Sequence, residues 1–298
     1  MAKRLLLASP RGFCKGVERA IKILEQAIAT ENTIIYVFKE IVHNTMVVKH
    51  FESLGVVFVN EIDDIPFGSV VVLSAHGVAP SVRQKAKERE LKVIDATCPL
   101  VTNVHNEAIL YKEQGYTIFL IGHKNHDEVV GILGEAPDNI QVICHSSEIE
   151  KIKIENKSNI SWLSQTTMND EETQRLVNLL RLKYPTLQDP PSSDICYATK
   201  NRQLAVKNIA KDCDLFIIVG SENSSNANRL VEVALLSGAK QSMRIETPDD
   251  LDEIDFSLIS TIGISSGASV PNEQLSSIIN HLNNICEIHI EEINSATE

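Results

Sequence analysis

The chain has 298 residues, of which 43% are hydrophobic and 23% are charged. This composition is typical of a folded globular protein and excludes a disordered or fibrous one. At about 100–200 residues per domain, the length allows two or three domains. The 28 basic and 40 acidic residues give a formal net charge of −12 at pH 7. A polyanion would be repelled over most of such a surface, so we expect no nucleic-acid partner.

The N-terminus begins like a signal peptide, with Lys3 and Arg4 before an apolar run. The run ends at Ser9-Pro10, however, short of the about 7–15 apolar residues of a signal peptide. No run approaches the about 18 apolar residues that a membrane span requires. We therefore expect a cytoplasmic protein with no membrane partner. In that reducing compartment, cysteines serve as buried thiols, nucleophiles or metal ligands rather than disulfides.

Short apolar runs rich in valine and isoleucine alternate with stretches of helical period. The clearest helical stretch begins at Val17 and repeats its apolar residues through Ile28. This alternation predicts repeated βαβ units, so the expected fold class is α/β with mainly parallel sheets. The predicted strands are Lys3–Ser9, Thr33–Phe38, Val56–Val59, Ser69–His76, Lys92–Thr97, Thr117–His123, Ile140–Cys144, Ile160–Thr166, Leu215–Gly220, Ser242–Glu246 and Thr261–Gly267.

Two features indicate domain organisation. The segment Tyr184–Asp194 contains three prolines and several turn-forming residues, which predicts a domain boundary. Cys14, Cys98 and Cys196 follow one another at intervals of about the length of a small α/β domain. No short tandem repeat is visible.

Polar side chains follow almost every predicted strand. Parallel sheets bind ligands beyond the carboxyl ends of their strands, where helix N-termini present free N–H groups. One such residue by itself is more often structural, but their coincidence at one end of the sheets predicts a functional site. Cys144, Cys213 and Cys286 are expected to be packing residues instead. The strand-end residues are Cys14, His43, His76, Cys98, His126, Glu128, Thr166, Ser224, Ser225, Asn226 and Ser269.

The three turn-associated cysteines, Cys14, Cys98 and Cys196, lie on separate loops without a C-x-x-C pair, which does not match the local spacing of zinc sites. Iron–sulfur clusters accept thiolates from distant loops, and three cysteines leave one iron of a cubane open for a substrate oxygen. Two alternatives remain: a zinc protein, and a metal-free phosphate-ester enzyme with a cysteine or serine nucleophile. In the latter, three histidines and the Ser224-Ser225-Asn226 loop would hold an anion.

Eight ordered motifs carry a family resemblance, from about Leu6 to about Leu282. The motifs are Arg-Gly-Phe-Cys14-Lys-Gly, Glu-Ile-Val-His43-Asn, Ser-Ala-His76-Gly, Asp-Ala-Thr-Cys98-Pro, Ser-Gln-Thr166-Thr, Asp-Ile-Cys196-Tyr, Glu-Asn-Ser224-Ser225-Asn226 and Gly-Ala-Ser269. Together they resemble the LytB-type 4-hydroxy-3-methylbut-2-enyl diphosphate reductases.

The resemblance implies a trefoil of three similar small α/β domains around a central 4Fe-4S cluster. Cys14, Cys98 and Cys196 would ligate this cluster, leaving one iron not ligated by cysteine. We expect the C-terminal tail to be polar and partly disordered. The expected domains are residues 15–97, 98–193 and 194–284, the last joined by an N-terminal strand at 1–14, with a tail at 285–298.

The resemblance also implies the reaction. A two-electron reductive dehydroxylation would convert 4-hydroxy-3-methylbut-2-enyl diphosphate, a small allylic diphosphate, to isopentenyl and dimethylallyl diphosphate. This is the last step of the methylerythritol phosphate route to isoprenoids. The electron donor would be a protein such as reduced ferredoxin or flavodoxin, and we expect a monomer.

The resemblance also implies roles for the residues at matching positions of this chain. Glu128 matches the proton donor, and a carboxyl beside an anionic diphosphate is easier to keep protonated. Thr166 matches the hydroxyl that relays or orients the proton. Asp127 stands where the family often has proline, and Asn103 where a basic residue is frequent. The substrate-binding residues would be Thr166, near the substrate's own hydroxyl, and the residues of the diphosphate pocket, which are His43, His76, His126, Ser224, Ser225, Asn226 and Ser269.

Overall fold

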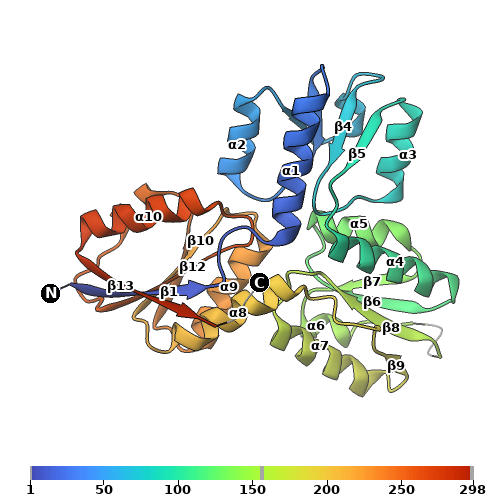
Figure 1. The fold of residues 1–298 in the computed structure, drawn as a ribbon. Helices are drawn as coiled ribbons and strands as arrows, with labels where there is room; N and C mark the ends of the chain where they lie inside the picture. Colours follow the sequence, from blue (N-terminus) through green and yellow to red (C-terminus); the bar gives the residue numbers. More distant parts are fainter. Residues whose placement is uncertain (1, 155–157, 296–298) are drawn as a thin grey trace. The chain divides into compact units, whose positions relative to one another are not determined.

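The computed structural model describes residues 2–154 and 158–295, in which helices and strands alternate along the chain (Figure 1). The strands are β1 Lys3–Ser9, β2 Ile35–Phe38, β3 Val57–Val59, β4 Val70–Leu73, β5 Lys92–Asp95, β6 Thr117–Ile121, β7 Ile140–Ile143, β8 Ile160–Ser164, β9 Leu187–Gln188, β10 Leu215–Val219, β11 Gln241–Ile245, β12 Thr261–Ser266 and β13 Ile288–Asn294. The α-helices are α1 Lys15–Thr30, α2 Thr45–Ser53, α3 Pro80–Glu88, α4 Pro99–Glu113, α5 Asp127–Glu135, α6 Ser146–Ile149, α7 Asp170–Lys183, α8 Tyr197–Ala210, α9 Ser225–Leu236 and α10 Asn272–Ile285. Two short 3₁₀ helices span Ile62–Asp64 and Pro248–Glu253.

The strands form three parallel sheets. One has the order β11-β10-β12-β1-β13, the second β3-β2-β4-β5 and the third β7-β6-β8-β9. Central strands such as β4 and β10 are buried along their whole length, as expected for parallel sheets covered by helices on both faces. The predicted α/β class with parallel sheets is confirmed. The two-residue strand β9 lies inside the segment predicted as a domain boundary and pairs with β8.

Alternate side chains of β1 pack in two separate cores. Leu5 and Leu7 of β1 pack in one apolar cluster with β10, β12 and α10, whereas Leu6 and Ala8 pack in another with α8 and α9. This period of two is what a strand buried on both faces requires. Among the described helices, none combines the length and apolar character that a membrane-spanning helix requires.

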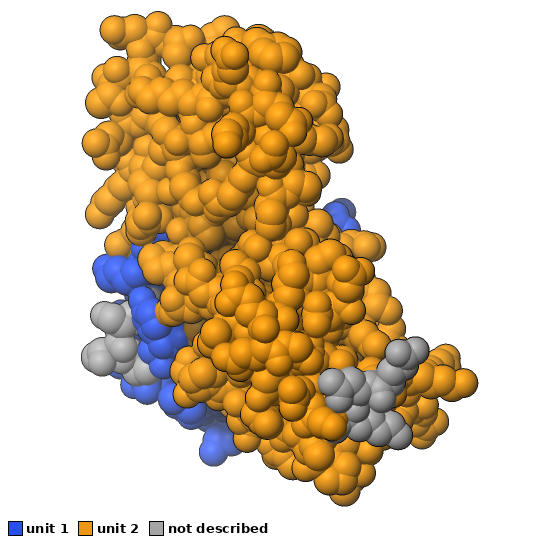
Figure 2. All heavy atoms as spheres, turned by 90° about the vertical axis from the view of Figure 1, so that its right-hand side faces the viewer, with its two compact units in different colours: residues 1–17, 43–49, 197–298 blue, residues 18–42, 50–196 orange. Residues whose placement is uncertain are grey.

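The chain divides into two compact units, which Figure 2 colours blue and orange. The five-stranded sheet belongs to unit 1, and both four-stranded sheets belong to unit 2. The three domains expected from the sequence, at 15–97, 98–193 and 194–284, stay a prediction. Unit 1 comprises Met1–Val17, His43–Lys49 and Tyr197–Glu298, and unit 2 comprises Glu18–Val42 and His50–Cys196.

The C-terminal segment differs from the prediction. Residues Ile288–Asn294, expected to belong to a partly disordered tail, form strand β13, which pairs with β1 over seven residues (Figure 1). The tail prediction is therefore wrong for this stretch, while residues 296–298 lie outside the described part. An edge strand pairs with one neighbour only, and its other edge faces solvent. Its residues can therefore be polar, which is why this stretch was predicted as a tail. Arg4 forms a bidentate ion pair with Glu291, in which both N···O distances are 2.8 Å.

A truncation after Glu287, which removes β13, should lower the midpoint of thermal unfolding by several degrees. The edge of β1 would lose its ladder of backbone hydrogen bonds, each worth about 1 kcal/mol net, and the apolar contacts of Ile288 and Ile293. The control is the double substitution Glu291→Gln and Glu292→Gln, which keeps the strand and removes only exposed ion pairs. Equal midpoints for the truncated and the full chain, measured by circular dichroism, would contradict a structural role for β13.

Candidate functional site

Glu128 is a buried carboxyl in the first turn of α5, only 2% exposed. It faces the loop after β8, where the backbone N–H of Thr166 donates to Oε1 at 2.6 Å and the Thr166 hydroxyl donates to Oε2 at 3.0 Å. The structure thus brings together the two residues that the sequence predicted as catalytic. Both lie in unit 2.

The surroundings of Glu128 favour its neutral form. Burial raises the pKa of the Glu128 carboxyl to about 7, although the two hydrogen bonds from Thr166 act in the opposite direction. A large fraction of this carboxyl is therefore protonated near neutral pH. That is the range in which a general acid both carries and releases a proton efficiently.

A second buried carboxyl lies beneath the same loop. Asp194 accepts a 2.7 Å hydrogen bond from the backbone N–H of Ser164, two residues before Thr166. Burial raises the pKa of Asp194 to about 8, and negative charge on Glu107 and Glu128 adds to this. Asp194 therefore anchors the loop that presents Thr166. Sequence analysis gave Asp194 no role, although it stands two residues before Cys196 in one of the quoted motifs.

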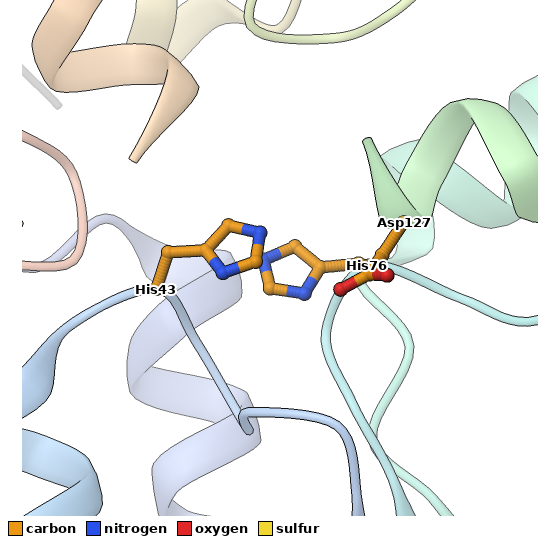
Figure 3. A group of neighbouring side chains, drawn as sticks. All are labelled: His43, His76 and Asp127. Atoms are coloured by element: carbon orange, nitrogen blue, oxygen red, sulfur yellow. The ribbon is translucent and has the colours of Figure 1, made fainter. Parts of the chain in front are cut away.

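Two histidines of unit 2 lie near Glu128. His126 is the N-cap of α5, and its Nδ1 accepts the backbone N–H of Glu128 at 3.2 Å. Since Nδ1 accepts, Nε2 carries the hydrogen and can donate it. The ring of His76, which follows β4, meets the His126 ring edge to face at a centroid distance of 5.8 Å. Figure 3 shows the side chains of His76 and Asp127 together, and their ligand atoms lie within 4.8 Å of each other. Figure 3 also draws His43, which belongs to unit 1.

The remaining predicted anion-binding residues lie in unit 1, at the start of α9. Ser224 is the N-cap of this helix and accepts the backbone N–H of Ala227 at 3.4 Å. Ser225 and Asn226 form the first turn, and the Asn226 side chain accepts the backbone N–H of Ala268 at 3.0 Å. A helix N-terminus with hydroxyl and amide groups is suited to bind phosphate.

His43 and Ser269 are joined directly within unit 1. The Ser269 hydroxyl donates to the backbone carbonyl of His43 at 2.8 Å. Because Ala268, next to Ser269, is held by Asn226, the unit brings His43, Ser269 and the start of α9 into one hydrogen-bonded group. The side chain of Asn223 lies 3.4 Å from Nδ1 of His43.

The three turn-associated cysteines each stand directly before a helix: Cys14 before α1, Cys98 before α4 and Cys196 before α8. Each backbone N–H donates to a carbonyl of a neighbouring loop, from Cys14 to Ala268, from Cys98 to Ala75 and from Cys196 to Thr166, at 3.0–3.1 Å. A helix N-terminus stabilises a thiolate. Cys14 lies in unit 1, whereas Cys98 and Cys196 lie in unit 2.

The other three cysteines differ in their burial. Cys213 is buried, as predicted, and burial raises the pKa of its thiol to about 12. Cys144 and Cys286 are only half-buried, and their thiols donate to the carbonyls of Gly122 and Leu282. None of the three precedes a long helix.

The family model described as LytB protein matches residues 5–283. The chain belongs to this family. It is 53% identical over 277 residues to the 4-hydroxy-3-methylbut-2-enyl diphosphate reductase of Acidothermus cellulolyticus, covering 93% of this chain and 82% of that one. It is 50% identical over 280 residues to the enzyme of the same name from Mycolicibacterium vanbaalenii, covering 94% of this chain and 83% of that one.

Two solved structures show the same likeness. The E-1-hydroxy-2-methyl-but-2-enyl-4-diphosphate reductase of Plasmodium falciparum superposes with a TM-score of 0.96 at 37% identity, covering 100% of this chain and 94% of that one. A structure of (E)-4-hydroxy-3-methyl-but-2-enyl diphosphate reductase, described as the terminal enzyme of the non-mevalonate pathway, superposes with a TM-score of 0.65 at 30% identity. That match covers 95% of this chain and 99% of the other.

Membership in the LytB family implies a metal cofactor. The residues present fit such a group, because within the described residues all six cysteines are thiols rather than disulfides. Cys14, Cys98 and Cys196 are moreover partly exposed. Arg202, fully buried on α8, donates to the carbonyl of Gly12 at 2.8 Å and so fixes the loop that carries Cys14. Sequence analysis missed Arg202, which stands inside a helix with no unusual pattern around it.

Proposed function

We propose that this chain is an iron–sulfur reductase that converts 4-hydroxy-3-methylbut-2-enyl diphosphate to isopentenyl and dimethylallyl diphosphate, the last step of the methylerythritol phosphate pathway. Two electrons and two protons are consumed. The allylic carbon–oxygen bond breaks, one proton leaves with the oxygen as water, and the other is added to carbon. The observation that carries this proposal is the buried Glu128 carboxyl, held by Thr166 and protonated near neutral pH, in a chain of the LytB family.

Cys14, Cys98 and Cys196 would hold a 4Fe-4S cluster with one iron not ligated by cysteine. When bound, such a cluster supplies single electrons and a Lewis-acidic iron for the substrate hydroxyl. Three thiols that each stand directly before a helix form a soft donor set. This donor set supports the cluster over hard-cation chemistry.

Glu128 acts as the proton donor for the departing hydroxyl. Its carboxyl is protonated in a large fraction of molecules near pH 7, and the hydroxyl of Thr166 is in hydrogen-bond contact with Oε2. This hydroxyl can accept the carboxyl proton on one side while donating its own hydrogen on the other. Thr166 therefore relays or orients the proton. The backbone N–H of Thr166 then stabilises the carboxylate that remains.

The residues proposed to bind the diphosphate come from both units. In unit 1, the N-terminus of α9 offers hydroxyl, amide and backbone N–H donors. In unit 2, His126 presents its Nε2 hydrogen beside the ring of His76. Charge-assisted hydrogen bonds from such donors are the strong ones. The proposed diphosphate-binding residues are His43, His76, His126, Ser224, Ser225, Asn226 and Ser269, and Thr166 is proposed to contact the substrate near its hydroxyl.

We also propose that the electron donor is a protein such as reduced ferredoxin or flavodoxin, that the chain is a monomer and that it is located in the cytoplasm. A surface with a formal charge of −12 leaves a diphosphate dependent on local donors, which the start of α9 and the two histidines provide.

Anaerobic purification followed by iron, sulfide and zinc analysis and a turnover assay tests the proposal. We expect a brown protein with iron and sulfide that consumes the allylic diphosphate only when a chemical one-electron reductant is supplied. A colourless protein that holds zinc would instead indicate a zinc protein. Release of phosphate without metal and without reductant would indicate a phosphate-ester enzyme. Either result would overturn the proposal.

A further inference from the structure

A buried histidine outside the proposed site lies between two glycines of unit 2. His105, on α4, is 8% exposed, and its Nδ1 lies 2.8 Å from Oε1 of Glu135 at the end of α5. Because a carboxylate only accepts, Nδ1 carries the hydrogen. The other nitrogen, Nε2, is buried and has no hydrogen-bond partner among the described residues. The ring is thus held by a hydrogen bond at Nδ1, and its Nε2 lies next to the two glycines.

The imidazole occupies the space that a side chain at either glycine would need. A Cβ added at Gly77 would stand 2.9 Å from Nε2 of His105, and one added at Gly131 would stand 3.2 Å from both Nε2 and Cε1. Gly77 also has a φ of +74°, a conformation that L side chains rarely adopt. Only glycine therefore allows both segments to approach the ring this closely.

The two glycines belong to segments that carry proposed site residues. Gly77 directly follows His76, in the turn after β4, and Gly131 stands three residues after Glu128 on α5. A further glycine of the same helix, Gly134, approaches Ala79 so closely that a Cβ there would overlap with it. The turn at 77–79 and helix α5 are therefore in direct contact. We call this contact the junction, and His105 packs beside it.

This junction joins parts of unit 2 that belong to different sheets. The turn after β4 belongs to the sheet β3-β2-β4-β5, whereas α5 follows β6 of the sheet β7-β6-β8-β9. The edge-to-face contact of His76 with His126 spans the same two segments. The separation of these rings consequently depends on how closely the turn packs against α5.

We infer that His105, held by Glu135, is a positioning residue: it sets the distance between the turn that carries His76 and the helix that carries His126 and Glu128. The inference rests on the proposed function, which gives His76 and His126 a role in diphosphate binding. His105 itself touches neither the substrate nor the cofactor in this role. It acts by filling the space beside the two glycines and by its hydrogen bond to Glu135.

A double-mutant cycle on the holoenzyme tests this. His105→Ala and Gly131→Ala should each lower kcat/KM by about 10–100-fold, mainly through KM, because a misplacement of about 1 Å can cost about 100-fold. The two variants combined should lose less than the product of the single losses, because removing the ring makes room for the new methyl group. Glu135→Gln, which keeps an acceptor for Nδ1, should stay within about 3-fold of wild type.

Val104→Ala is the matched control for stability. Val104 is the neighbour of His105 on α4 and packs in the apolar core with Leu120 and Ile132 rather than against the glycines. It should lower the unfolding midpoint and leave kcat/KM within about 3-fold of wild type. Titration calorimetry with inorganic diphosphate adds a binding readout, and His105→Ala should weaken this binding about as much as it raises KM.

Strictly multiplicative losses in the cycle, or losses that follow only the unfolding midpoint as in Val104→Ala, would overturn the inference alone. A wild-type protein that neither binds inorganic diphosphate nor turns over the allylic diphosphate would overturn the proposed function, and the inference with it.

Discussion

Glu128→Gln should lower kcat by about 10²–10⁴-fold, the contribution typical of a well-placed general acid. The glutamine side chain keeps the shape of the carboxyl and can still accept the backbone N–H of Thr166, so the loop should stay in place. It carries no proton that can be released. Single-turnover kinetics with a pre-reduced enzyme, together with iron and sulfide analysis, separate this loss from a loss of cofactor. Turnover near the wild-type rate would remove Glu128 from the role of proton donor.

The neighbouring carboxylate provides the control for this experiment. Asp127→Asn removes a charge from the same helical turn but leaves both contacts between Glu128 and Thr166 intact. It should keep kcat within about 3-fold of wild type. In the wild type, kcat/KM should fall as the pH rises above about 7, because the protonated fraction of Glu128 in the free enzyme then decreases. Loss of activity in Asp127→Asn equal to that in Glu128→Gln would indicate a general effect of charge at the start of α5.

Glu128→Gln should also change the stability of the cofactor-free protein. The pKa of Glu128 is raised from 4.5 to about 7 by burial, so the folded state binds its proton more tightly than the unfolded state does. This contribution to the free energy of unfolding is fully present below pH 4.5 and is lost as the pH rises through 7. Glu128→Gln should therefore gain stability relative to wild type across this range, by roughly 3 kcal/mol at pH 8, measured by urea unfolding.

Cys98→Ala should produce the second large effect, a protein with little or no iron, sulfide or visible absorption and no measurable turnover. Cys98 is the N-cap of α4 and its backbone N–H is held by Ala75, so the loop should fold without the thiol. The broad absorption near about 400 nm that thiolate-ligated clusters give should disappear. Iron and sulfide analysis after anaerobic purification measures the loss directly.

Cys286→Ala is the matched control, because Cys286 is a half-buried thiol directly after α10 whose Sγ donates to the carbonyl of Leu282 in that helix. It should retain wild-type iron, sulfide and turnover. A full complement of iron in Cys98→Ala, or an equal loss in Cys286→Ala, would contradict the assignment of Cys98 as a ligand.

Much of the fold could be predicted from local patterns, and the exceptions have physical reasons. Strand β1 was predicted at the bounds the structure gives, because its central residues Leu5–Ala8 are buried on both faces and form a continuous apolar run. Strand β13 was not predicted, because it is an edge strand whose residues are mostly exposed or half-exposed. Strand β9 has only two residues and lies among prolines, where no periodicity can show.

The site shows the same division. Glu128 and Thr166 could be named from their motifs, but the two hydrogen bonds between them join residues 38 positions apart in the sequence. Asp194 could not be recognised as an anchor of the Thr166 loop, since an aspartate in a proline-rich stretch is usually an exposed turn residue. Its burial arises where the fold brings it against Ser164 at the end of β8, 30 positions earlier in the sequence.

The sequence by itself determined the α/β class, the family and the list of chemically capable side chains, because apolar periodicity and motif order are properties of the chain alone. Only the tertiary structure decided which of these side chains meet. The raised pKa of Glu128 arises from burial, and the packing of His105 against Gly77 and Gly131 arises from the close approach of segments from two sheets. Burial and close approach depend on distances between remote parts of the chain, which local patterns do not specify.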